Sequence, residues 1–151
     1  MGYTHYWYRP VGSKVDPAIW RSICNDARKL IAAADYPVVY GYDQPNRPAE
    51  ANGYHIWFNG AGDAGHETFY FPRITEEQSA WRQGEPEVFS FCKTARKPYD
   101  DLVCALLAIL AERIPEQIEV SSDGSACEWT PALSWASGVL GRTLTLPKQI
   151  D

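Results

Sequence analysis

The sequence predicts an α+β fold: a single two-layer domain, residues 1–151, in which a largely antiparallel sheet of about five or six strands packs against two main helices and a short C-terminal helix. The element order β-α-β-β-β-β-α-β-α, read from the hydrophobic periodicity, is typical of that class. Two neighbouring strands flank one glycine-rich loop, which favours an antiparallel pair. A chain of 151 residues is long enough to bury a core.

The first third of the chain predicts a strand, a helix and a second strand. Residues 3–8 (YTHYWY) alternate as a strand covered on both faces does. Asp16 followed by Pro17 is a helix start, and apolar residues recur at helical spacing over about 17–34. A short strand, 38–42, follows Pro37. The next segment, 43–53, has turn residues and no periodicity, so we expect a mobile flap.

The middle of the chain predicts three strands. Residues 54–58 and 67–71 both alternate and are expected to pair around the glycine loop. A helical turn and a loop are expected over 75–87. Residues 88–94 (VFSFCKT) then predict a further strand.

The last third predicts a buried helix, a strand and a final helix. Residues 98–114 are apolar on nearly every side, which is typical of a central helix, and Pro115 ends it. Residues 118–120 predict a short strand. The pair Thr130-Pro131 predicts the start of the short C-terminal helix.

Composition restricts the partners. The formal charge is −5 and the isoelectric point about 5.2, which argues against a protein that wraps duplex nucleic acid. The longest apolar run, 102–111, is too short for a bilayer span, and the first ten residues lack the apolar segment of a signal peptide. We therefore expect a cytoplasmic protein with no membrane partner.

The four cysteines show no CxxC spacing and are expected to be reduced and mostly buried, so no metal site and no cofactor are predicted. Asp63 with Glu67 offers two carboxylates without a third ligand, which is weak evidence for a metal. The six tryptophans and nine tyrosines exceed what core filling needs. Such rings stack on nucleobases or anchor an interface.

Residues 58–65 (FNGAGDAG) place Gly60, Gly62 and Gly65 at the spacing of a dinucleotide-binding turn. That interpretation requires a helix after the glycines, whereas the residues that follow predict a strand. Two alternatives remain. The glycines provide the backbone freedom of a long hairpin loop, or they let backbone N–H groups approach an anion.

Residues 91–101 (FCKTARKPYDD) place Lys93, Arg96 and Lys97, with Thr94 between them, at the start of the central helix. Cations and a helix N-terminus together favour a phosphate or another anion. The alternative is a capped, salt-bridged helix start, because two aspartates occupy the first turn. Further along, Ser122 and Asp123 read either as turn residues or as groups that contact a base edge or a ribose.

The three histidines, His5, His55 and His66, fall in or beside predicted strands. If two of them met across the sheet, they would form an acid and base pair for metal-free phosphodiester cleavage. The alternative is that each is a structural residue with satisfied hydrogen bonds.

Four segments, GYTHYW, FNGAGDAGHETF, FCKTARKPYD and VSSDG, together resemble an uncharacterised family of small proteins of tailed phages and prophages. The likeness extends from Gly2 to Gly124. The resemblance implies a phage accessory protein that acts inside a bacterium. Accessory proteins of this size are often counter-defence factors, and one class of them sequesters or cleaves nucleotide second messengers.

These observations predict a homo-oligomeric protein that sequesters a small anionic nucleotide, such as a cyclic oligonucleotide. In that hypothesis the basic side chains bind phosphate, the glycines allow close approach, and aromatic rings stack on a base; the predicted stacking rings include Trp7, Trp57 and Tyr99. One alternative is an enzyme, a metal-independent phosphodiesterase that uses a histidine as acid and base. Another is an inhibitor that acts by protein–protein contact.

Overall fold

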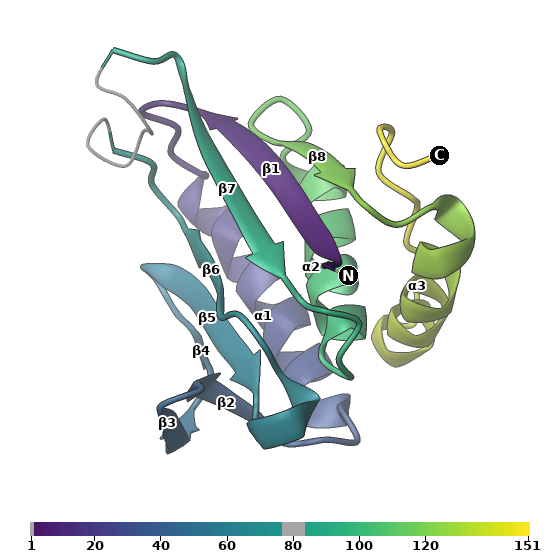
Figure 1. Ribbon diagram of the computed structural model, residues 1–151. Coiled ribbons are helices and arrows are strands. Elements are labelled where there is room, and N and C mark those ends of the chain that lie inside the picture. The colour runs from purple at the N-terminus through teal and green to yellow at the C-terminus, as the bar shows by residue number, and fades with distance from the viewer. Residues whose placement is uncertain (1, 77–83) are drawn as a thin grey trace.

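The computed structural model of the protein describes residues 2–76 and 84–151 (Figure 1). It confirms the α+β class, with antiparallel strands and helices in separate layers. The strands are β1 (Thr4–Pro10), β2 (Val38–Gly41), β3 (Gln44–Pro48), β4 (Glu50–Ala51), β5 (His55–Gly60), β6 (Phe69–Pro72), β7 (Glu87–Lys93) and β8 (Glu119–Ser122). The helices are α1 (Pro17–Ala33), α2 (Asp100–Arg113) and α3 (Ala126–Leu140), and η1 (Gly62–Ala64) is a short 3₁₀ turn.

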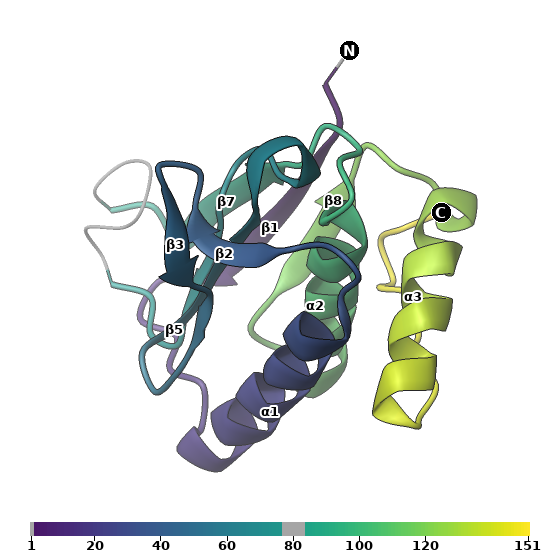
Figure 2. The same cartoon turned by 90° about the horizontal axis from the view of Figure 1, so that it is seen from below.

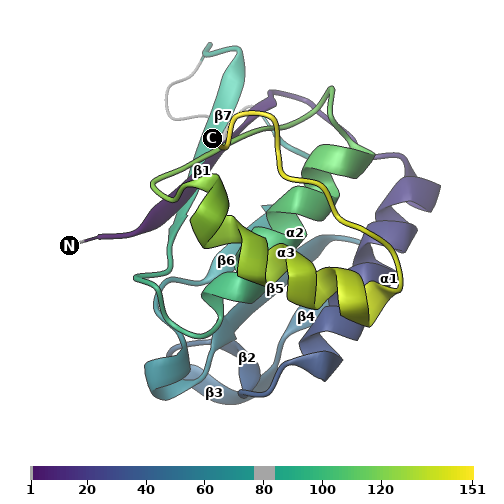
Figure 3. The ribbon, with the colours of Figure 1, turned by 90° about the vertical axis from the view of Figure 1, so that its right-hand side faces the viewer.

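The strands form two sheets rather than the one that was expected. A three-stranded sheet has the order β7-β1-β8, and a five-stranded sheet has the order β3-β2-β5-β4 with β6 on the other edge of β5. All pairs are antiparallel. The pairing of β5 with β6 around the glycine loop confirms the predicted hairpin. The helices lie together on one side of the sheets, with α2 packed against both α1 and α3 (Figures 2 and 3).

Helix α2 is the centre of the core, as its all-round apolar sequence predicts. Every residue from 102 to 110 is buried. The helix ends at Arg113 because Pro115 cannot continue it. Within the described part of the chain, no helix combines the length and the apolar character that a bilayer crossing requires.

Two expectations for individual elements are corrected. The segment 43–53 is not the mobile flap that was expected but contains strands β3 and β4. These strands pair with β2 and β5, and the turn-rich sequence gives no local signal of that pairing. Helix α3 begins at Ala126 rather than near Thr130, because Ser125 and Glu128 form a reciprocal capping box. The helical turn expected over 75–87 lies largely outside the described residues.

The four cysteines are free thiols, and three of them, Cys24, Cys92 and Cys104, are buried. Burial raises the pKa of Cys24 to about 11 and that of Cys92 to about 12. Because the thiolate is the reactive form, we expect only the exposed Cys127 to react rapidly with Ellman's reagent in the native protein. All four should react after denaturation. Rapid reaction of two or more thiols in the native state would contradict this burial.

The same shifts predict how stability depends on pH. The folded state holds the protons of Cys24 and Cys92 more tightly than an unfolded thiol with the ordinary pKa of 9.0 does. Their contribution to stability is complete below pH 9 and is lost as the pH rises through their folded-state pKa values. Urea denaturation at a series of alkaline pH values measures the effect.

Candidate functional site

The glycine loop, the basic segment and the turn after β8 come together around Tyr3, the residue that precedes β1. The Tyr99 N–H of the basic segment donates to the Ala64 carbonyl of the glycine loop over 3.1 Å, and the Thr94 N–H donates to the Tyr3 carbonyl over 3.0 Å. Gly124 lies against the Tyr3 hydroxyl so closely that a Cβ atom would be 2.0 Å from it. Segments 60–66, 93–100 and 121–124 are thus connected through direct contacts.

Within the glycine loop, two of the three glycines serve internal packing. A Cβ on Gly60 would lie 2.3 Å from the Ala64 carbonyl oxygen, and one on Gly65 would lie 2.1 Å from the Gly60 oxygen. Gly62 has a φ of 54°. The loop N–H groups of Ala64 and Gly65 donate to carbonyls of the same loop. This geometry favours the hairpin-loop interpretation of the motif over the anion-binding one.

The three basic residues do not converge on one anion site. Arg96 forms an ion pair with Glu128, and its guanidinium lies 4.0 Å above the Tyr3 ring. The hydrogen bond to Glu128 raises the pKa of Arg96 further. Arg96 and Lys97 line a hollow of about 260 Å³ in which carboxylates outnumber them; the carboxylates are those of Asp100, Asp101 and Glu128. The salt-bridged helix start is therefore the interpretation that the geometry favours.

The segment between β7 and α2 has a strained backbone. Ala95 and Arg96 have positive φ values of 52° and 58°, a conformation that costs about 1–2 kcal/mol for a residue with a side chain. Thr94 holds the segment in place. It is fully buried, and its hydroxyl donates to Asp100 Oδ1 over 2.5 Å. Strained backbone that is held by buried contacts is common at active sites and ligand-binding segments.

Beneath this segment, a buried polar network is centred on His5. The imidazole is 0% exposed. Its Nδ1 lies 2.7 Å from Ser122 Oγ and its Nε2 lies 2.6 Å from Asp100 Oδ1. The rings of Tyr3 and Trp129 contact the imidazole edge-on, at centroid distances of 5.1 and 5.2 Å. Strand β1 supplies the histidine, α2 the aspartate and β8 the serine, so three elements that are distant in sequence build the network.

The hydrogen bonds of Ser122 determine the imidazole tautomer. The Gly124 N–H and the Trp129 Nε1–H both donate to Ser122 Oγ, over 2.9 and 3.1 Å. A hydroxyl has two acceptor lone pairs and one hydrogen, so the hydrogen of Ser122 goes to His5 Nδ1. The single ring proton is then on Nε2 and donates to Asp100. The same saturation leaves Ser122 Oγ no free lone pair for nucleophilic attack, and the serine acts as a positioning residue for His5.

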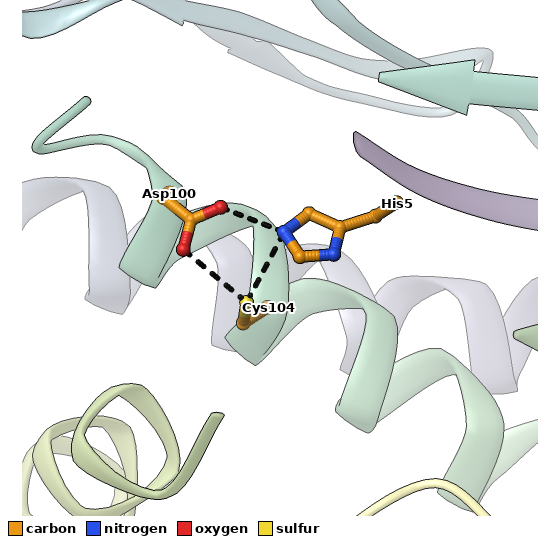
Figure 4. A group of neighbouring side chains, drawn as sticks. All are labelled: His5, Asp100 and Cys104. Atoms are coloured by element: carbon orange, nitrogen blue, oxygen red, sulfur yellow. Dashed lines mark hydrogen bonds and ion pairs between the residues drawn. The ribbon is translucent and has the colours of Figure 1, made fainter. Parts of the chain in front are cut away.

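Three side chains in this network could hold a metal ion. One ligand atom each of His5, Asp100 and Cys104 lies within 4.8 Å of the others (Figure 4). Burial, followed by the charge of Asp100, raises the pKa of the Cys104 thiol well above its usual range. This group of three could not be predicted from sequence spacing, because His5 is 95 positions away from Asp100 along the chain.

The other two predicted histidines are not part of this network. His55 belongs to the five-stranded sheet, where its Nε2 lies 2.8 Å from Glu50 Oε1. His66 is exposed beside the glycine loop. The two-imidazole acid and base pair is therefore not assembled from His5 and His55, which lie in different sheets. The Glu67 carboxylate accepts the Lys93 N–H over 2.7 Å, which accounts for it structurally.

The aromatic residues predicted to stack on a base are largely occupied. Trp7 is 2% exposed and packs against Phe69 in the core. Tyr99 is also buried, and its hydroxyl donates to the Glu67 carbonyl over 2.5 Å. Trp57 is half-buried, with one ring face stacked on Tyr40 at a centroid distance of 4.7 Å.

A different set of rings is available on the three-stranded sheet. Side chains alternate along a strand, so His5 and Trp7 of β1 point toward the helices while Tyr6 and Tyr8 point away from them. On β7, Phe89 and Phe91 point away in the same manner. The register pairs Tyr6 with Phe91 and Tyr8 with Phe89. We call these four residues the aromatic face.

Three rings of the aromatic face are exposed, Tyr6 is half-buried, and the rings contact one another. Tyr8 is 38% exposed, Phe89 39% and Phe91 54%. Phe89 lies 6.1 Å from Tyr6 in a stacked arrangement, 5.0 Å from Tyr8 and 5.9 Å from Phe91. The alternation of β1 and β7 is visible in the sequence, but the packing of the helices decides which side stays open.

Polar groups border the aromatic face at one end. Lys93 is two residues beyond Phe91 on the same side of β7 and pairs in register with Thr4. Asp123 accepts the Tyr6 hydroxyl over 3.1 Å and the Thr4 N–H over 3.0 Å. Of the predicted ligand-binding residues, the structure therefore places Lys93 and Asp123 beside the open rings, whereas Thr94, Ser122 and the glycines support the fold behind them.

Comparisons with protein-family models, with curated proteins and with solved structures give no match for this chain.

Proposed function

We propose that the protein binds a small nucleotide on the aromatic face, with a base stacked on Phe91 and Tyr6 and a phosphate beside Lys93. The observation that carries the proposal is a row of mutually contacting rings, three of them exposed, on an open antiparallel sheet, with a cation on the same face. Aromatic side chains on such surfaces stack on bases of any identity, and adjacent cations bind the backbone phosphates.

The spacing suits one nucleotide unit. Alternate residues of a strand are roughly 7 Å apart, so the Lys93 ammonium and the Phe91 ring are both within reach of a single nucleotide. The Asp123 carboxylate accepts the Tyr6 hydroxyl, and in the proposed complex it would accept a further hydrogen bond from a base edge or a ribose hydroxyl. The net charge of −5 favours a ligand with one or two phosphates over a long polyanion.

The biological role is a proposal of the same kind. A nucleotide held on this face without chemistry fits sequestration of a signalling nucleotide by a phage accessory protein, and the phage setting itself stays a prediction from the resemblance. His5, the histidine nearest to this face along the chain, is fully buried on the opposite side of β1. This burial favours binding over cleavage. A homo-oligomer also stays a prediction.

Replacing Phe91 with alanine is expected to weaken nucleotide binding roughly tenfold to a hundredfold, because one base–aromatic stack is worth about 1–3 kcal/mol. The probes are adenosine monophosphate, a linear diadenylate and a cyclic dinucleotide, titrated by calorimetry. The matched control is Tyr54→Ala, since Tyr54 is 82% exposed and lies outside the aromatic face. Lys93→Gln should weaken binding and reduce its dependence on salt.

Two outcomes would overturn the proposal. One is that no probe binds at millimolar concentration. The other is that Phe91→Ala binds every probe as tightly as Tyr54→Ala does. Sedimentation of the same variants shows whether a second copy of the chain covers the face instead, because Phe91→Ala would then change the oligomeric state and leave any nucleotide affinity unchanged. Recovery of intact ligand after denaturation separates sequestration from cleavage.

A further inference from the structure

We infer that His5, Asp100 and Cys104 form a binding site for one zinc-class metal ion. This site lies on the helix side of β1, behind the sheet that carries the aromatic face, so it does not depend on the proposed nucleotide function. Figure 4 shows the imidazole of His5 reaching from β1 toward α2, where Asp100 and Cys104 stand one helical turn apart.

The two distances from the sulfur to the other ligand atoms suit tetrahedral coordination. His5 Nε2 lies 3.5 Å from Cys104 Sγ, and Cys104 Sγ lies 3.7 Å from Asp100 Oδ2. Typical zinc–sulfur, zinc–nitrogen and zinc–oxygen bond lengths place tetrahedral ligand atoms about 3.3–3.7 Å apart. Asp100 Oδ1 accepts the Thr94 hydroxyl, so Oδ2, the oxygen that faces the sulfur, is the one that would bind the ion.

The surroundings suit a cation that enters from solvent. His5 and Cys104 are completely buried, whereas the Asp100 side chain is 19% exposed and lines the hollow of about 260 Å³ at the start of α2. That hollow has three carboxylates and two cationic side chains, so its net charge is negative. Asp100 thus lies between the hollow and the two buried ligands, and three protein ligands leave a fourth position for water.

Supporting hydrogen bonds are present for two of the ligands. Ser122 contacts the nitrogen of His5 that the ion does not use, and Thr94 holds the other oxygen of Asp100. Partners of this kind orient metal ligands in known sites. Thiolate, imidazole and carboxylate together favour zinc, or cobalt as its spectroscopic substitute, over magnesium or calcium, which take oxygen ligands.

Binding of the metal ion moves two protons, one on Cys104 and one on His5. Cys104 releases its thiol proton to solvent as the metal–sulfur bond forms. The ring proton of His5 moves from Nε2 to Nδ1 and donates to Ser122 Oγ, which turns its own hydrogen away and gives up one of the two bonds that it accepts from Gly124 and Trp129. One proton is therefore released per ion. Binding therefore costs the charge-assisted hydrogen bond from His5 to Asp100 Oδ1 and one neutral bond at Ser122, and the bonds from the ion to a thiolate, an imidazole and a carboxylate have to offset that cost.

Titration of the metal-free, reduced protein with cobalt(II) tests the inference. We expect one ion per chain, a thiolate-to-cobalt charge-transfer band in the near ultraviolet, and one proton released to a pH indicator in weak buffer. Cys104→Ser should abolish the band and weaken cobalt binding at least tenfold. Cys127→Ser, which changes an exposed thiol outside the site, is the matched control and should bind as the wild type does.

The wild-type titration alone can overturn the inference. Absence of a charge-transfer band at millimolar cobalt would show that the three side chains form only a hydrogen-bonded network. A band that persists in Cys104→Ser would place the metal elsewhere. If circular dichroism shows that Cys104→Ser is unfolded, Asp100→Asn is measured in its place. That variant should keep the band and bind cobalt at least tenfold more weakly, and unchanged affinity would exclude Asp100 as a ligand.

Discussion

Gly60→Ala is expected to lower the free energy of unfolding by about 3 kcal/mol, at the upper end of the usual cost of overpacking. The new Cβ atom would lie 2.3 Å from the Ala64 carbonyl oxygen and 2.8 Å from the Gly65 nitrogen. Both neighbours are backbone atoms of a loop that is closed by its own hydrogen bonds, so neither can move aside cheaply. The loop and strand β5 would have to separate to admit one methyl group.

Urea denaturation followed by circular dichroism measures this effect. Gly53→Ala is the matched control, because a Cβ atom there meets nothing within 4 Å and the residue does not have a left-handed backbone. It should change stability by less than about 0.5 kcal/mol. Equal stabilities for the two variants would show that the loop can relax. The conclusion that Gly60 is required for close packing would then be wrong, and the alternative that the glycine loop binds an anion would be favoured again.

Ser122→Ala is expected to destabilise the protein by about 3 kcal/mol, because several buried polar groups lose their partner at once and each orphaned group costs about 1–3 kcal/mol. The groups are His5 Nδ1, the Trp129 indole N–H and the Gly124 N–H. His5 and Trp129 are completely buried, so neither ring can turn toward solvent to find a new partner.

The neighbouring serine provides the comparison. Ser121 precedes Ser122 on β8, points to the opposite side of the sheet and pairs in register with Tyr6. Ser121→Ala should therefore cost less than about 0.5 kcal/mol. Thermal or urea unfolding of both variants is sufficient. If Ser122→Ala is as stable as Ser121→Ala, the hydrogen-bond count that assigns the His5 tautomer is incorrect.

Several elements could be predicted from the sequence because their signals are local. Asp16 and Pro17 mark the start of α1, and the Asp16 carboxylate accepts the N–H groups of Ala18 and Ile19. The all-round apolar run of α2 predicts a central buried helix, and the alternating segments around the glycine loop predict the β5–β6 hairpin. In each case the determining residues are within a few positions of one another.

The candidate sites were less accessible to sequence reasoning. The cluster Lys93, Arg96 and Lys97 predicts one anion site, but Glu128, more than thirty positions further on, pairs with Arg96. Likewise, aromatic content indicates stacking surfaces without showing which rings face the core. Trp7 and Tyr8 are neighbours in the sequence, yet the first is buried in the core and the second is exposed.

The sequence by itself determined the class of fold, the helices and most strands, because periodicity and capping act over one or two turns of chain. Only the tertiary structure decided which strands became neighbours and which faces stayed open. The pairing of β1 with both β7 and β8 brings His5, Asp100 and Ser122 into one network across more than a hundred positions. The helices cover one side of that sheet, and this choice exposes the aromatic face. Long-range pairing depends on the sum of many weak contacts, and no short stretch of sequence encodes that sum.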